Sequence, residues 1–159
     1  MTRLLIRKAL FTVVVLAASA LVLACYEPRP QLNYIWFLGP DSTTSVPPHA
    51  YRYFQFPVTQ DMLQWKTRTA TFALKLADDG NPPGHDSASF YILDSLAYVR
   101  YIHSETFEAL ARQENSADCD ISAGVTAPGR YYMVLSNLLD TLVERRYIGT
   151  ASMTYWELR

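Results

Sequence analysis

Short runs of β-prone residues, separated by clusters of turn-forming residues, limit the fold of this chain more than any other feature. Residues 69–77 are the clearest example, because the apolar side chains of Phe72, Leu74 and Leu76 fall on every second position. Successive side chains of a strand point to opposite faces, so this spacing predicts a strand with one buried face. A sheet with one apolar face must pack that face against another layer.

Four other segments are rich in Tyr, Phe, Ile, Val and Thr, the residues that suit a pleated surface. They are residues 51–58, 90–93, 131–135 and 147–158. Clusters of Gly, Pro, Asn and Asp favour turns. These clusters lie at residues 39–48, 78–84 and 128–129. The pattern predicts a mainly β fold, an antiparallel β-sandwich of jelly-roll type.

Residues 95–113 have a different pattern. Residues 105–113 are good helix formers, with Ser104 as the expected N-cap. Glu108 and Arg112 form a favourable i,i+4 pair on such a helix. We therefore expect one or two short helical turns here, as a small helical insertion in the sandwich.

The first 24 residues differ from the rest of the chain. Arg3, Arg7 and Lys8 make a basic start, and residues 9–24 are almost entirely apolar. As a helix this apolar run spans about 24 Å, less than the ~30 Å hydrocarbon core of a bilayer. A basic start, a short apolar run and a small-residue end are typical of a secretory signal.

The end of this signal, Val22-Leu23-Ala24-Cys25, resembles a bacterial lipobox. In that family the Cys thiol receives a diacylglyceryl group, the signal is cleaved before the Cys, and the freed amine is acylated, for instance with palmitate. The resemblance implies cleavage between Ala24 and Cys25, lipidation of Cys25 and a membrane as partner. A plain secretory signal and an uncleaved anchor helix are the alternatives.

The lipobox resemblance also implies an address in the cell envelope. In many Gram-negative bacteria an Asp directly after the Cys retains the protein at the inner membrane. Tyr26 occupies that position here, which favours the outer membrane if the organism has one. The predicted organisation is a signal peptide in residues 1–24, a tether and first strand in 25–48, and the sandwich in 49–159. Residues 33–38 predict the first strand, although their Trp and Tyr would also suit a membrane interface.

The charge balance excludes one class of partner. The whole chain has a formal charge of −1. Without the three basic residues of the signal it keeps 11 basic and 15 acidic residues, a charge of −4. We expect no nucleic acid partner, because phosphate binding needs a surplus of Lys and Arg. We also expect the lipid, rather than surface charge, to hold the protein at a membrane.

Cys119 has no intrachain partner if Cys25 carries lipid. Asp118 and Asp120 flank it, and neighbouring carboxylates raise the pKa of a thiol, so we do not expect a reactive thiolate. An incidental free thiol is the main interpretation of Cys119. An inter-chain disulfide and a catalytic role are the alternatives.

No spacing in the chain predicts a catalytic or metal site. His49, His85 and His103 form neither a His-x-His nor a His-Glu-x-x-His motif, and a zinc site needs three or four convergent ligands. A nucleophile elbow, a P-loop and a dinucleotide fingerprint are also missing from the sequence. We therefore predict no catalytic residue, no metal and no cofactor. The eleven tyrosines suit either a sandwich core or, where exposed, a binding surface.

A second resemblance covers roughly residues 90–159. Residues 90–94, the turn Pro128-Gly129 followed by Tyr131-Tyr132, a strand that ends at Asn137, and a last strand with Thr154-Tyr155 are similar to the back half of GOLD-type or CUB-like sandwiches. The resemblance implies a non-catalytic interaction module. Sandwich loops vary freely, so it does not identify a ligand.

These features together predict a membrane-tethered bacterial lipoprotein that acts as a non-catalytic binding or scaffolding module in the cell envelope. Its partner would be an envelope protein or a glycan. One alternative is a small envelope hydrolase or metalloprotein that uses His85, Asp86 or His103. Another is a subunit of a larger envelope complex.

Overall fold

Strands make up most of the computed structural model, which describes residues 29–65, 67–85, 87–140 and 142–158. The strands are β1 (Pro30–Val46), β2 (Tyr51–Val58), β3 (Ala70–Asp78), β4 (Ala88–Asp94), β5 (Ala111–Ser116), β6 (Cys119–Val125), β7 (Gly129–Ser136) and β8 (Arg145–Leu158). Those ranges also contain a 3-10 turn, η1 (Asp61–Leu63), and an α-helix, α2 (Ser95–Ile102). Residues 30–157 belong to one compact unit.

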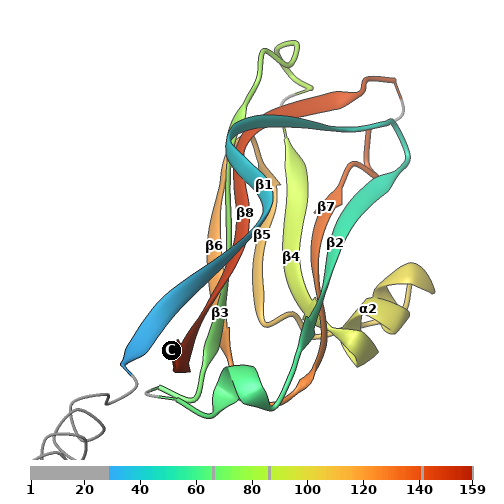
Figure 1. The fold of residues 1–159 in the computed structure, drawn as a ribbon. Coiled ribbons are helices and arrows are strands. Elements are labelled where there is room, and N and C mark those ends of the chain that lie inside the picture. Colours follow the sequence, from blue (N-terminus) through green and yellow to red (C-terminus); the bar gives the residue numbers. More distant parts are fainter. Residues whose placement is uncertain (1–28, 66, 86, 141, 159) are drawn as a thin grey trace, which may run out of the picture. The chain divides into compact units, whose positions relative to one another are not determined.

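The strands form two four-stranded sheets, in the orders β1-β8-β3-β6 and β2-β7-β4-β5. The pairs β4/β5, β3/β6, β2/β7 and β1/β8 are nested, as in one long hairpin whose successive pairs alternate between the two sheets (Figure 1). The registered pairs are antiparallel. This arrangement is an eight-stranded jelly roll. The predicted mainly β antiparallel sandwich is confirmed.

The core lies between the inner faces of the two sheets. On β3 the side chains of Phe72 and Leu74 are fully buried, as the alternation predicts, and those of Thr71 and Lys75 are exposed. Met153 of β8 is the register partner of Phe72. The second sheet contributes further buried side chains to the same core, among them Phe56, Phe90, Met133 and Leu135.

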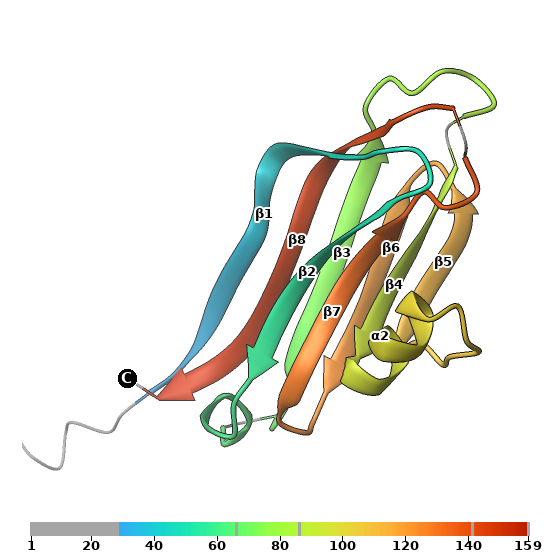
Figure 2. The ribbon, with the colours of Figure 1, turned by 90° about the vertical axis from the view of Figure 1, so that its right-hand side faces the viewer.

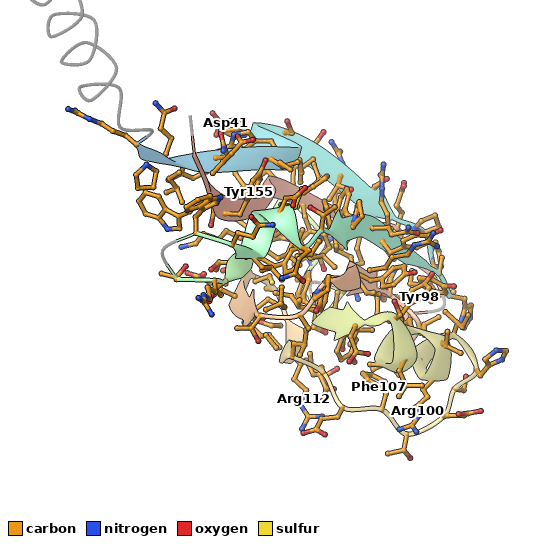
Figure 3. The ribbon with its side chains drawn as sticks, turned by 60° about the horizontal axis from the view of Figure 1, so that its bottom comes forward. Asp41, Tyr98, Arg100, Phe107, Arg112 and Tyr155 are labelled. Carbon is orange, nitrogen blue, oxygen red and sulfur yellow. The ribbon has the colours of Figure 1, made fainter. Side chains whose placement is uncertain are left out.

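A second apolar cluster covers the outer face of the second sheet. Tyr91 and Leu93 of β4 and Tyr132 and Val134 of β7 point away from the main core and pack beneath α2. Figure 2 shows α2 lying across this sheet, and Figure 3 shows Tyr98 and Phe107 on the same side of the molecule. The helix explains why residues 90–93 and 131–135 are apolar on both faces: both faces are covered.

The helical insertion lies earlier in the chain than the sequence predicts. α2 begins after Asp94, whose Oδ1 accepts a hydrogen bond from the Ala97 N–H at 2.8 Å, and it ends at Ile102. Ser104 has a positive φ of 57°, so it follows the helix and caps none. The helix predicted for residues 105–113 is wrong, because residues 111–113 pair with β4.

The first strand is longer than the sequence predicts. Residues 33–38 lie in β1, which confirms a strand there, but β1 also runs through residues 39–46, where we expected a turn. The chain turns only after Val46, and His49 in that turn has a φ of 53°. Figure 1 shows β1 bending along its length, and Asp41, which lies within this strand and is labelled in Figure 3, has a φ of 58°.

The predicted signal peptide, with Ala24 and Cys25, lies outside the described residues. In the part of the chain that is described, none of the helices has the length and apolar character needed to cross a bilayer.

Candidate functional site

A polar pocket of about 310 Å³ lies where the β3–β4 and β7–β8 loops meet. These loops are adjacent because β3 ends and β8 begins at the same end of the first sheet, where Asp78 of β3 is the register partner of Tyr147. The pocket lining includes His85, Ser87, Ser89, Ser136, Asn137, Leu139, Asp140, Leu142 and Arg145.

Asp140 is at the centre of the hydrogen bonds around this pocket. Its Oδ1 accepts from the backbone N–H groups of Leu142 and Val143, and its Oδ2 lies 2.9 Å from His85 Nδ1 and 2.5 Å from Arg145 Nη2. The Leu142 N–H and then His85 contribute most to a pKa that is lowered to about 2. Asp140 is therefore ionised at neutral pH.

The state of Asp140 fixes the role of His85. An ionised carboxylate can only accept hydrogen bonds, so His85 Nδ1 carries a proton and donates a hydrogen bond to Asp140 Oδ2. A neutral His85 ring then has Nε2 as an acceptor. His85 is the one histidine of the three that is bonded to a carboxylate in the described ranges.

Arg145 is the most buried charged residue at the pocket, with 3% of its surface exposed. Its Nη2 pairs with Asp140, and its Nε donates to Asn137 Oδ1 at 3.3 Å. Its Nη1 is buried and has no hydrogen-bond partner among the described residues. A buried donor without a partner is costly and is usually matched by an ordered water or a ligand.

Asn137 connects the cluster to the rest of the fold. Its Nδ2 lies within 3.2 Å of the carbonyl oxygens of Val46, Pro47 and Val143. The backbone N–H of His49 also donates to the Asp140 carbonyl oxygen at 3.0 Å. These bonds join the β1–β2 turn to the β7–β8 loop, and the His85–Asp140 bond adds the β3–β4 loop.

Sequence reasoning found His85 but missed Asp140, Asn137 and Arg145. These three residues follow β7 within nine positions, yet no spacing motif joins them to His85. His103 caps the end of α2 and His49 lies in the β1–β2 turn, whereas Asp86 is outside the described residues. Where the chain is described, no three His, Cys, Asp or Glu residues converge on a possible metal position.

Cys119 lies at the start of β6 and is buried. Its Sγ donates to the Leu74 carbonyl oxygen at 3.5 Å. Burial, more than the neighbouring Asp120, raises the pKa of the thiol to about 12. The expectation of an unreactive thiol agrees with this environment, but desolvation is the main cause rather than flanking charge.

Most of the tyrosines that we considered for a binding surface are packing residues. Tyr101 lies on the buried face of α2, and its hydroxyl donates to Ser136 Oγ at 2.8 Å. Burial raises the pKa of Tyr101 to about 12. The rings of Tyr98 and Tyr132 are stacked, with centroids 3.9 Å apart and planes 4° apart. Tyr53, at the edge of the same cluster, is exposed.

No protein-family model matches this chain, and no curated protein matches it either.

Proposed function

We propose that this chain is a bacterial lipoprotein whose β-sandwich serves as a non-catalytic binding module in the cell envelope. The observation that carries the proposal is the sequence Val22-Leu23-Ala24-Cys25 after a basic and then apolar start. Two or three acyl chains on Cys25 would hold the protein firmly, because each buried CH₂ contributes about 0.8 kcal/mol. The tether would concentrate the sandwich against partners at the same surface.

The anchor is tested by metabolic labelling with a fatty-acid probe. Wild-type protein is expected to take up the label and Cys25→Ala to lose it. Cys119→Ala is the matched control, since it removes the other cysteine of the chain and should keep the label. Label on Cys25→Ala, or none on the wild type, would contradict the proposal.

We propose the pocket around Arg145 as the ligand site of the module. Its polar groups suit hydroxyl, amide or carboxylate oxygens of an envelope protein or a glycan. The buried Arg145 supplies donors in a water-poor setting, and the largely exposed Leu139 and Leu142 lie at the same pocket. Ligand sites commonly combine apolar contacts with a few placed polar groups that fix the orientation of the ligand.

This site is tested by photo-crosslinking in intact cells. A photoreactive amino acid replaces Leu139 at the pocket or, as the control, Leu96, an exposed leucine of α2. We expect a discrete adduct from position 139 that is absent at position 96. Adducts of equal yield at both positions would contradict a ligand site at the pocket.

The finer family resemblance supports the same role. β7 begins at Gly129 directly after Pro128, and Asn137 follows its last residue, as in the GOLD-type and CUB-like pattern. Loops of a sandwich vary freely and often carry function, and most of the proposed site lies in loops. A stable partner in purified native membranes would make this chain a subunit of a larger envelope complex.

A small envelope hydrolase is the second candidate, and one observation favours it. The 2.9 Å bond between His85 Nδ1 and Asp140 Oδ2 is the kind that orients a general base. Ser87, Ser89 and Ser136 line the same pocket, but in the described ranges none of them has a hydrogen bond to His85 Nε2. Turnover of ester, glycoside or peptide substrates that is abolished by His85→Ala would favour this candidate.

A further inference from the structure

Three large side chains are exposed on the outward positions of the first half of β1. Leu32, Tyr34 and Trp36 have 40%, 55% and 48% of their surfaces exposed. We call them the aromatic stripe. The rings of Tyr34 and Trp36 stack, with centroids 6.0 Å apart and planes 10° apart. The residues between them, such as Ile35 and Phe37, pack against the core.

The position of the stripe makes this exposure costly. β1 is at the edge of its sheet, with β8 on one side and no strand on the other among the described residues. An exposed, apolar edge strand is a site for uncontrolled pairing with other chains, which proteins usually blunt with charge or cover. Residues 30–40 contain no charged residue. Since this segment has no charge to discourage pairing with other chains, we expect another surface to cover the aromatic stripe.

We infer that the aromatic stripe lies against the lipid bilayer that holds the protein. The inference rests on the proposed lipid anchor. Leu32 lies seven positions after Cys25, with six residues between them, and an extended chain over seven positions reaches at most about 25 Å. The anchor thus keeps the stripe within reach of the headgroup region at all times.

The chemistry of the stripe fits the headgroup region. Trp and Tyr are enriched at both membrane–water interfaces, where an apolar ring and a polar N–H or O–H are both satisfied. The stripe has one of each beside a leucine. A strand that packs one face on the core and rests the other among the headgroups would keep these apolar side chains away from water.

The test uses the lipidated protein in vesicles of phosphatidylcholine and phosphatidylglycerol, with and without brominated acyl chains. Vesicles are first recovered by flotation. Brominated lipid is expected to quench the tryptophan emission of the wild type by roughly one third, since Trp36 is one of three tryptophans. Trp36→Phe should remove most of this quenching, and the matched control Trp65→Phe, at another exposed tryptophan, should keep it.

The outcomes separate this inference from the anchor itself. Protein that floats without quenching, or quenching that Trp36→Phe leaves unchanged, would overturn the stripe contact while the anchor stands. Protein that does not float would overturn both. A Trp36 that is shielded from aqueous iodide as well as from brominated lipid would place a second protein chain on the stripe and would also overturn the contact with lipid.

Discussion

At the residue scale, Gly149 of β8 has the least room for a side chain among the glycines that the structure describes. Its φ is 151°, and a Cβ built on it would overlap the carbonyl oxygen of Lys75 on the neighbouring β3. We expect Gly149→Ala to lower the free energy of unfolding by about 3 kcal/mol, measured by urea denaturation. Gly80→Ala is the control, because Gly80 also has a positive φ, 75°, but has open space around it. This substitution should lower the free energy of unfolding by about 1 kcal/mol. Equal losses would show that the contact with β3 is unimportant.

The carboxylate of Asp140 should make stability depend on acid pH. Its pKa is lowered to about 2 in the folded protein, so its ionised form stabilises the fold above about pH 4, and this contribution is lost as the pH falls towards 2. Asp140→Asn should be less stable than the wild type at pH 7, and urea denaturation should show the difference shrinking at low pH. Asp120→Asn, at an exposed carboxylate, is the control. A difference that does not vary with pH would contradict the pairing.

Cys119 should be inert in the folded protein. With a pKa raised to about 12 by burial, almost none of the thiol is ionised at pH 8. We expect a colorimetric thiol reagent to modify it more than about 100-fold more slowly than a free cysteine, and fully once urea unfolds the chain. Rapid modification of native protein, or a dimer on non-reducing gels, would instead indicate an accessible thiol.

At the element scale, the N-cap of α2 makes its own contribution to the free energy of unfolding. Asp94→Ala removes the acceptor of the Ala97 N–H and should lower the free energy of unfolding by about 1 kcal/mol. Asp94→Asn keeps an acceptor oxygen and should cost much less. Chemical denaturation measures both variants. If Asp94→Asn lost as much as Asp94→Ala, the charge of Asp94, rather than its hydrogen bond, would be what stabilises the helix.

Elements were predictable from sequence where the local pattern and the tertiary packing agree. β3 alternates because one of its faces is buried, and residues 90–93 of β4 and 131–135 of β7 are apolar on both faces because α2 and its cluster cover the second face. Residues 105–113 are good helix formers, but residues 111–113 of that stretch are paired with β4 and Phe107 packs on Tyr91 and Tyr101. Helix propensity is a small term that such pairing and burial override.

At the scale of the whole molecule, the nested strand pairs predict slow folding. β1 and β8 pair although they are at opposite ends of the described chain. The entropy of closing this long loop is lost before the contacts between the two strands can stabilise the fold. We expect refolding in about milliseconds to seconds, monitored by stopped-flow tryptophan fluorescence after dilution from urea. Complete recovery of the native signal within microseconds would contradict this topology.

The sequence by itself determined the mainly β sandwich and most of its strands, because burial of one face of a strand leaves a period of two in the chain. It also carries the predicted lipid site at Cys25, since a lipobox is a local motif. Only the tertiary structure brought His85 to Asp140 and Arg145, and only it left Trp36 and its neighbours on an open edge. Such arrangements depend on which loops and strands become neighbours in the folded protein. The spacing of residues along the sequence does not show which distant segments these are.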